Sequence, residues 1–293
     1  MVPVTTRRGA AVIELLIALP LALLLSGLAV QILLTQLRAT RRVEWRVHNL
    51  RELEHGALVL AADVRAASAS DIEAWTDSSV VLHAPVLVAI VCAAPAPNVV
   101  DVIAGDGMHP LRAVQFASPR SGDRFVYGHT DSAMLGAPAA TLDTASFQAV
   151  LVAATPEPSA CALSPLRASA GGAPWRLTLS APLPVAPDVA SGVALTRRTE
   201  WRSYRAGDQR YYLGRRDWNG VNWSVIQPVI GPLLSNTQGG FAVGVARADL
   251  SPLVTAARDA RFVRFRFRSE RPLTVGAPLR DSLLVTFALR GGQ

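Results

Sequence analysis

Lysine is missing from this sequence of 293 residues, so every one of its 29 basic residues is an arginine. Enzymes that use a lysine as a Schiff base, as a general base or as the phosphate-binding residue of a P-loop are therefore excluded. The motifs G-x-S-x-G, G-x-G-x-x-G and H-E-x-x-H are also missing, and the five histidines are scattered. We expect a protein that is not an enzyme and that holds no cofactor or metal.

Cysteine is almost as scarce. The two cysteines, Cys92 and Cys161, lie far apart and outside any metal-ligand spacing. In an exported domain such a pair favours a single disulfide over a zinc site, and two buried free thiols are the alternative.

Only one segment is apolar enough to enter a membrane. Residues 15–30 carry no charge, and the segment before them, MVPVTTRR, is short and positive. Because basic residues mark the cytoplasmic side of a span, Arg7 and Arg8 predict a cytoplasmic N-terminus. The protein is then expected in the inner membrane with a single span and with its remaining chain in the periplasm.

Three structures fit this N-terminus: a cleaved secretory signal peptide, an uncleaved signal anchor, and a prepilin-type leader cut on the cytoplasmic side of the apolar run. A signal peptide has an apolar core of about 7–15 residues followed by a small-x-small site. Here the run is longer, and the best such site, Gly27-Leu28-Ala29, is poor. The chain also continues without proline or glycine from there to Gly56.

That continuation has helical periodicity, with apolar residues three or four apart on one face. The sequence predicts one helix over 10–67, which spans the membrane over 15–34 and is amphipathic over 35–67. Pro20 is expected to kink the first half, because it removes a backbone hydrogen bond. The apolar stripe consists of Leu50, Leu53, Ala57, Leu60 and Val64.

Glu14 stands at the start of the apolar run, where a carboxylate is costly. At the centre of a bilayer the cost is about 2.5–3.5 kcal/mol, and it is less near the interface. If the chain is cut after Gly9, the new α-amino group of Ala10 is a positive charge four residues away. The two groups can neutralise each other within one helix or between neighbouring subunits. An ordinary anchor with a glutamate at its helix start is the alternative.

The segment GAAVIEL, from Gly9 to Leu15, follows a short basic leader and precedes an apolar helix. It resembles the prepilin peptidase site of type IV pilins and type II secretion pseudopilins. The resemblance implies a leader over 1–9, cleavage by prepilin peptidase between Gly9 and Ala10, N-methylation of Ala10, and a role for Glu14 in subunit register. Most members have Phe where this chain has Ala10.

The following helical segment, LRELEHGALVLAADVRAAS, is similar to minor pilins of the PilW type and minor pseudopilins of the GspJ/PulJ type. A weaker match covers TRRTEWRSYRAGDQRYYLGRRDWNGVNWSVIQPVIGPLLS. A competing resemblance, of RRGAAVIELLIALPLALLL to the Tad-type pilus proteins TadE and TadF, ranks second, because those chains are typically shorter.

Residues 68–293 predict a β-rich periplasmic head, because short apolar runs alternate there with Gly, Pro and Ser clusters. The second half of the helix would pack on a mainly antiparallel sheet, which gives a pilin-like α+β fold. We expect loops over 93–98, 132–144 and 155–174. Expected strands cover 86–91, 113–116, 124–127, 175–180, 193–204, 209–215, 223–227, 241–245, 262–268 and 283–289.

Two segments of the head have alternative interpretations. DWNGVNW contains the turn signal Asn219-Gly220 and predicts a hairpin, whereas Asp217, Asn219 and Asn222 offer oxygens for calcium. RFVRFRFR places Arg264, Arg266 and Arg268 on one side of a strand, where they could bind a nucleic-acid backbone. More often such a row is the solvated face of a strand.

Together these features predict a structural subunit: a minor pilin or minor pseudopilin that leaves the inner membrane for a pilus or pseudopilus filament near its tip. Its partners would be prepilin peptidase, other pilin or pseudopilin subunits and inner-membrane lipid. The alternative is a membrane-anchored periplasmic binding module with an uncleaved leader and nucleic acid as its ligand. An exported enzyme is the third interpretation, and no motif supports it.

Overall fold

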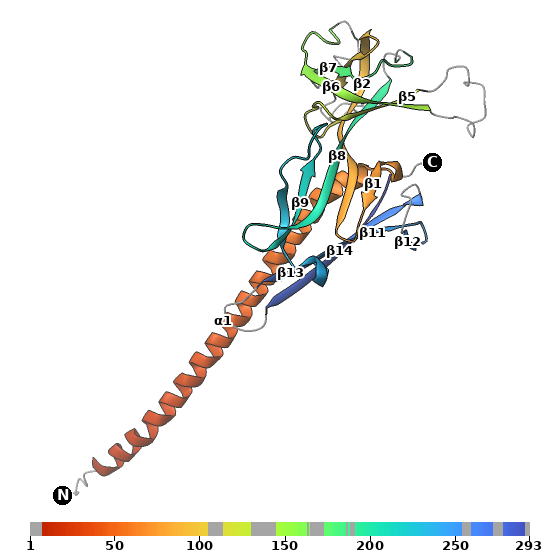
Figure 1. Ribbon diagram of the computed structural model, residues 1–293. Helices are drawn as coiled ribbons and strands as arrows, with labels where there is room; N and C mark the ends of the chain where they lie inside the picture. The colour runs from red at the N-terminus through yellow and green to blue at the C-terminus, as the bar shows by residue number, and fades with distance from the viewer. Residues whose placement is uncertain are drawn as a thin grey trace, which may run out of the picture.

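The chain forms one long helix that carries a β-rich head on its second half (Figure 1). The expected α+β fold, with an apolar N-terminal helix before an antiparallel β domain, is confirmed. This computed structural model describes residues 8–104, 114–129, 145–162, 164, 173–185, 187, 191–253, 259–271 and 278–290.

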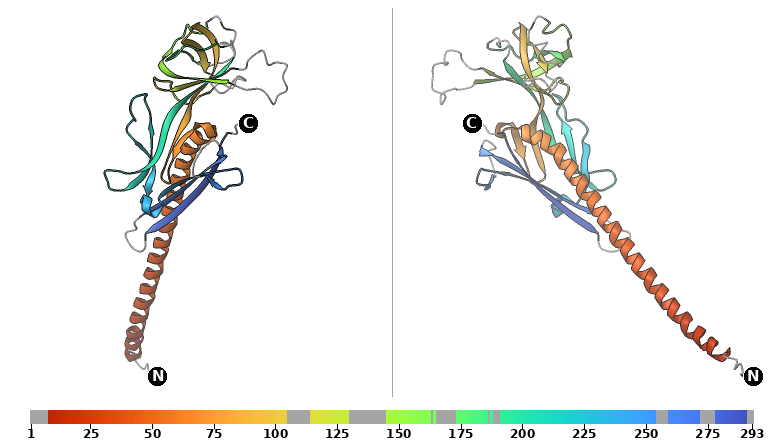
Figure 2. Two further views of the ribbon diagram at one scale, coloured as in Figure 1. Left: turned by 45° about the vertical axis from the view of Figure 1, so that its right-hand side comes forward. Right: turned by 180° about the vertical axis from the view of Figure 1, so that it is seen from behind.

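Helix α1 runs from Arg8 to Ala66, within two residues of the expected bounds, and Pro20 lies inside it. Its 59 residues correspond to about 88 Å at 1.5 Å per residue. Every residue over 14–48 is exposed, whereas burial begins at Asn49. The helix therefore has a bare first half and a packed second half, as Figure 2 shows from behind.

The packed half buries the face that its periodicity predicts. Leu53, Ala57, Leu60 and Val64 are at most 5% exposed, while Leu50 is only half-buried at the edge of the head. This stripe packs against β14, β10, β2 and β13 and belongs to one hydrophobic core with the strands.

Two sheets build the part of the head that packs on α1, which we call the body. One contains β1, β2, β8, β9 and β10 in that spatial order, and the other has the order β12-β11-β13-β14. Their bounds are β1 Ile72–Trp75, β2 Ser79–Ala96, β8 Gly192–Arg205, β9 Tyr211–Asp217, β10 Gln227–Leu233, β11 Phe241–Ala246, β12 Pro252–Leu253, β13 Phe262–Arg271 and β14 Leu279–Ala288.

The second sheet buries an aromatic cluster under the helix. Phe265 and Phe267 on β13 are fully buried, and the Phe265 ring lies 6.0 Å from the ring of Phe241 on β11 and 6.0 Å from that of Phe287 on β14. Because side chains alternate along a strand, the arginines between them face outward.

Beyond the body, six antiparallel strands close into a barrel. The pairings β2–β3, β3–β7, β7–β6, β6–β5, β5–β8 and β8–β2 form a complete circuit among the described strands. The barrel lies at the end of the molecule farthest from the N-terminus (Figure 1). The remaining barrel strands are β3 Val99–Ala104, β5 Arg124–His129, β6 Ala145–Pro156 and β7 Pro174–Leu179. The short strand β4, Val114–Gln115, pairs with β2 alone among the described strands.

The barrel has a hydrophobic core of its own, separate from that of the body. Phe125, Leu151, Leu177 and Leu195 are at most 1% exposed inside it. Strands β2 and β8 pair from Ser79↔Arg202 to Ile90↔Gly192 and so run through both parts. The segment 68–293, expected as one head, thus contains two cores joined by a two-stranded ladder.

Several strand expectations need correction. Strand β2 is much longer than 86–91 and covers most of the expected loop 93–98. Strands β1, β3, β6 and β12 were not expected, and residues 155 and 156, expected in a loop, end β6. A strand over 223–227 is wrong, because β10 only begins at Gln227. The expected loop 132–144 lies outside the described residues.

Candidate functional site

The bare half of α1 exposes an unbroken apolar surface. Its large apolar side chains from Leu15 to Leu34 are 46–69% exposed. By length and composition this is the one helix among the described residues that could cross a membrane. In water such a surface would be unfavourable at about 25 cal/mol per Å². Lipid or other helices must therefore cover it.

Two hydroxyl groups, one within this run and one directly after it, are satisfied by the helix itself. The Ser26 hydroxyl donates to the Ala22 carbonyl at 2.7 Å, and the Thr35 hydroxyl donates to the Gln31 carbonyl at 2.8 Å. Such bonds to the preceding turn let a hydroxyl lie in lipid without an unpaired donor.

Glu14 has no such partner among the described residues: it is exposed, and its carboxylate forms no hydrogen bond or ion pair with them. Gly9 and Ala10 lie in the first turns of α1, so Ala10 is one helical turn before Glu14. The rest of the expected leader, 1–7, lies outside the described residues. The backbone therefore places the expected cleavage point one turn from the unpaired carboxylate.

A polar cluster fixes the helix where it leaves the head. The Asn49 amide donates to the Ser269 hydroxyl at 2.6 Å and to the Asp281 carboxylate at 2.7 Å. Arg46 donates to the other oxygen of Asp281 at 3.1 Å. Because Asn49, Ser269 and Asp281 are all buried, these bonds hold the direction of the bare half relative to β13 and β14.

A second polar contact anchors the far end of α1. Asp63 accepts hydrogen bonds from the Trp201 indole and from Arg215, both at 3.0 Å. Burial raises the pKa of the Asp63 carboxyl, and the Arg215 charge opposes this shift. No local sequence pattern predicts this contact, since helix residue 63 and strand residues 201 and 215 are far apart in the chain.

Arginine and aspartate also meet at the junction of body and barrel. Arg197 makes two hydrogen bonds to Asp123, at 2.7 and 2.9 Å, and both residues are buried. Arg120 donates to Asp217 at 3.2 Å, and Thr199 donates to the other oxygen of Asp217 at 3.1 Å. This network joins strands of both cores and has a structural role.

The hairpin expected at Asn219-Gly220 is confirmed. Trp218 and Trp223 form an antiparallel bridge, and their rings lie 5.4 Å apart. The Asn219 side-chain oxygen accepts the backbone N–H groups of residues 221 and 222. Two of the three oxygen donors considered for calcium, on Asp217 and Asn219, are thus already occupied by protein groups.

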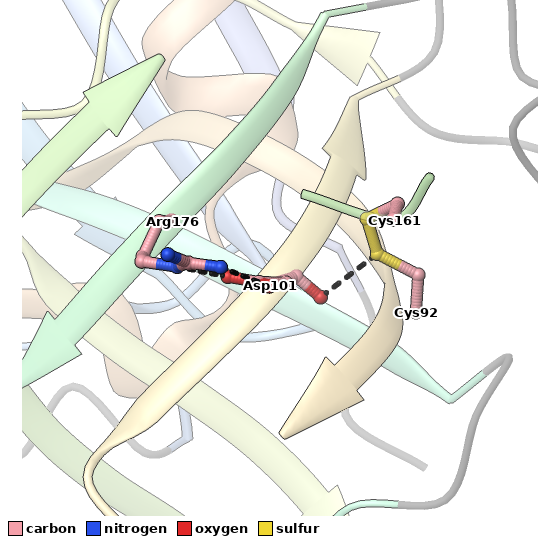
Figure 3. Close-up of a disulfide and its surroundings, with 4 residues drawn as sticks. All are labelled: Cys92, Asp101, Cys161 and Arg176. Atoms are coloured by element: carbon pink, nitrogen blue, oxygen red, sulfur yellow. Dashed lines mark hydrogen bonds and ion pairs between the residues drawn. A yellow bond between two sulfur atoms is a disulfide. The ribbon is translucent and has the colours of Figure 1, made fainter. Parts of the chain in front are cut away.

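The expected disulfide between Cys92 and Cys161 is formed (Figure 3). It connects β2 to the turn after β6, and beside it the Asp101 carbonyl lies 3.2 Å from the Cys92 sulfur. The Asp101 carboxylate is held by two hydrogen bonds from Arg176, each 2.8 Å long. This ion pair joins β3 to β7 beside the disulfide.

The row of Arg264, Arg266 and Arg268, which we call the arginine row, lies exposed on the outer face of β13. None of the three guanidinium groups forms an ion pair with a described residue. Ala242 and Gly244 on β11 flank the row on one side, and Ser282, Leu284 and Thr286 on β14 flank it on the other.

Within the described part of the chain, no three His, Cys, Asp or Glu side chains converge as a metal site would require. The features that stand out are the bare apolar half of α1 with its lone carboxylate and the exposed arginines. No protein family model, no curated protein and no solved structure matches this chain.

Proposed function

We propose that the protein is a minor pilin or minor pseudopilin, a structural subunit that assembles into a filament after prepilin peptidase cleavage. The observation that carries the proposal is the division of α1. One continuous helix is packed in its second half and exposed at every residue over 14–48, and Glu14 at the start of this stretch has no partner among the described residues. A subunit that exchanges lipid for neighbouring helices needs this layout.

The mechanism follows from electrostatics in a medium of low dielectric constant. Cleavage after Gly9 gives Ala10 a free, positively charged amine, which is then a substrate for N-methylation. The Glu14 carboxylate of an incoming subunit pairs with the amine of its neighbour, because both charges are costly in lipid until they meet. The pairing sets the axial register, and the apolar surface over 15–34 supplies the packing.

Processing is tested by the intact mass and N-terminal sequence of the chain co-expressed with a prepilin peptidase. The wild-type chain is expected to begin at Ala10, whereas a Gly9→Val variant keeps Met1. A wild-type chain that keeps Met1, or that begins near residue 30, contradicts the proposal.

Assembly is tested with Glu14→Ala in a strain that forms the filament. The variant is expected to be processed normally and yet to be missing from sheared filaments, because its neighbour's amine has no counter-charge. Glu14→Asp serves as the matched control, since it keeps the charge. Normal incorporation of the alanine variant would defeat the mechanism.

A pilus or type II secretion pseudopilus subunit of the PilW or GspJ/PulJ type is favoured over a Tad-type subunit by the size of the head. The body and the barrel together extend the chain well beyond a short anchor. We propose that the barrel places the subunit near the filament tip, where a bulky distal part meets no subunit above it. Labelling of the filament end with an antibody to the barrel tests this position.

A second function, nucleic-acid binding by an anchored module, rests on the arginine row. Residues two apart on a strand are about 6.6 Å apart, so the row presents, over about 13 Å, three charges that have no ion-pair partner among the described residues. If it binds DNA, Arg264→Gln, Arg266→Gln and Arg268→Gln together should weaken binding uniformly across sequences and lower the salt dependence. An unchanged affinity leaves the row as a solvated strand face.

A further inference from the structure

A second group of arginines lies on α1 directly after the apolar surface. Arg38, Arg41 and Arg42, which we call the arginine face, are spaced i, i+3 and i+4 and so share one side of the helix. All three are exposed, and none forms an ion pair with a described residue. Glu44 lies three residues after Arg41 on the helix surface but forms no ion pair with a described residue.

The position of the arginine face relative to a bilayer follows from helix geometry. Residues 15–34 cover about 30 Å, the thickness of the hydrocarbon core. Arg38 then lies about 6 Å beyond the hydrocarbon, and Arg42 lies about 12 Å beyond it. Since helix side chains lean toward the N-terminus, the guanidinium groups of Arg41 and Arg42 reach back toward the headgroups.

The next arginine along α1 shows which side of the helix faces the head. Arg46, one turn after Arg42, is bound to Asp281 of β14. Arg42 therefore lies on the side of α1 on which the head projects, and Arg38 and Arg41 lie progressively farther round the helix from it. A lipid headgroup bound beside Arg42 would contact α1 on the side on which the head projects.

We propose that Arg38, Arg41 and Arg42 bind the phosphate groups of anionic phospholipids at the membrane surface nearer the head. Guanidinium groups form paired, charge-assisted hydrogen bonds with phosphate, which suits a face made only of arginine. The inference rests on the membrane span of the proposed function and adds a lipid preference to it. The bound lipids restrict the tilt of α1 relative to the membrane until the helix leaves the lipid during assembly.

The test is native mass spectrometry of the full-length chain in detergent with equal amounts of phosphatidylglycerol and phosphatidylcholine. The wild-type chain is expected to retain the anionic lipid preferentially, with each arginine contributing about fivefold. Replacement of Arg38, Arg41 and Arg42 by Gln should bring the two lipids close to equal retention.

A matched control replaces Arg51, Arg210 and Arg247 by Gln, which removes the same charge from exposed positions elsewhere. This control should keep the preference. Loss of the preference in the control, or its persistence in the Arg38, Arg41 and Arg42 variant, would overturn the proposal. Displacement of the lipid by millimolar inorganic phosphate would also overturn it, because a free anion would then be the ligand.

Carbonate extraction of membranes separates this inference from the proposed function. A chain released by carbonate has no span, which contradicts the anchor itself. A chain that stays in the membrane but shows no anionic preference contradicts only the role of the arginine face.

Discussion

The indole Nε1 of Trp201 donates a hydrogen bond across 3.0 Å to the carboxylate of Asp63 and thereby joins β8 to α1. Trp201 is fully buried, so its N–H has no access to water. The same carboxylate oxygen accepts a hydrogen bond from Arg215 of β9. Helix and sheet are thus connected by a buried polar contact near the C-terminal end of α1, in addition to the cluster around Asn49.

Replacement of Asp63 by Ala should lower the free energy of unfolding by about 2–3 kcal/mol, because the Trp201 N–H and the Arg215 charge both lose their acceptor. Denaturant unfolding in detergent, followed by tryptophan fluorescence, measures the loss. Glu54→Ala, at an exposed position of the same helix, is the control and should change little. Equal effects of the two variants would show that the Asp63 contact contributes nothing specific.

Gly56 permits the close approach of α1 to β10. A Cβ atom at this position would lie 1.9 Å from Cγ1 of Ile230, which is itself 2% exposed. Gly56→Ala should therefore destabilise the head by about 1–3 kcal/mol, although alanine favours a helix by about 1 kcal/mol.

Adding Ile230→Ala to the Gly56→Ala variant should cost less than the sum of the two single changes, because the smaller side chain removes the clash. Thermal unfolding of the three variants measures this coupling. Gly27→Ala is the control, since no atom lies within 4 Å of its Cβ position. Strictly additive losses would rule out the close contact as the cause.

His83 on β2 makes the head sensitive to acid. Burial, together with the charges of Arg124 and Arg198, lowers the pKa of His83 from 6.5 to about 4 against the opposing charges of Asp71 and Glu73. Between pH 6.5 and 4 the unfolded chain therefore binds a proton that the folded chain does not.

The free energy of unfolding should consequently fall as the pH drops from 6.5 toward 4. His83→Gln should flatten the profile in that window, whereas His55→Gln, on the exposed side of α1, should leave it unchanged. Denaturant titrations at several pH values provide the measurement. A His83→Gln profile as steep as that of the wild type would assign the acid sensitivity to other groups.

The disulfide should stabilise the barrel more than the body. Its sequence separation of 69 residues corresponds to about 4 kcal/mol of lost loop entropy in the unfolded chain. Replacing both cysteines by Ser should raise amide hydrogen exchange in β3, β6 and β7 and leave the interface of α1 with β14 protected. An equal rise throughout the head would contradict this division.

The local features were predictable from the sequence because they depend on neighbouring residues. The stripe Leu53, Ala57, Leu60 and Val64 is buried as its spacing indicates, and the alternation around Phe265 and Phe267 holds along β13. The turn at Asn219 likewise follows from its own residues.

The barrel was not predictable in the same way. Strand β6, ASFQAVLVAATP, is rich in alanine and has weak strand propensity, and it is held by pairing with β5 along one part and β7 along the other. Closure of the barrel depends on the pairing of β2 with β8, which lies more than a hundred residues later in the chain. No short-range pattern in the sequence encodes such a pairing. Likewise, the partners of Asp63 and Asn49 are set by the packing of α1 on distant strands.

The ladder formed by β2 and β8 has a mechanical consequence. Both strands run uninterrupted from the body into the barrel, so no flexible tether separates the two. A pull on the barrel along these strands is carried by two covalent backbones and by hydrogen bonds loaded in shear, which must break together. Force applied at the distal end would therefore be transmitted along β2 and β8 to the body before these two strands separate.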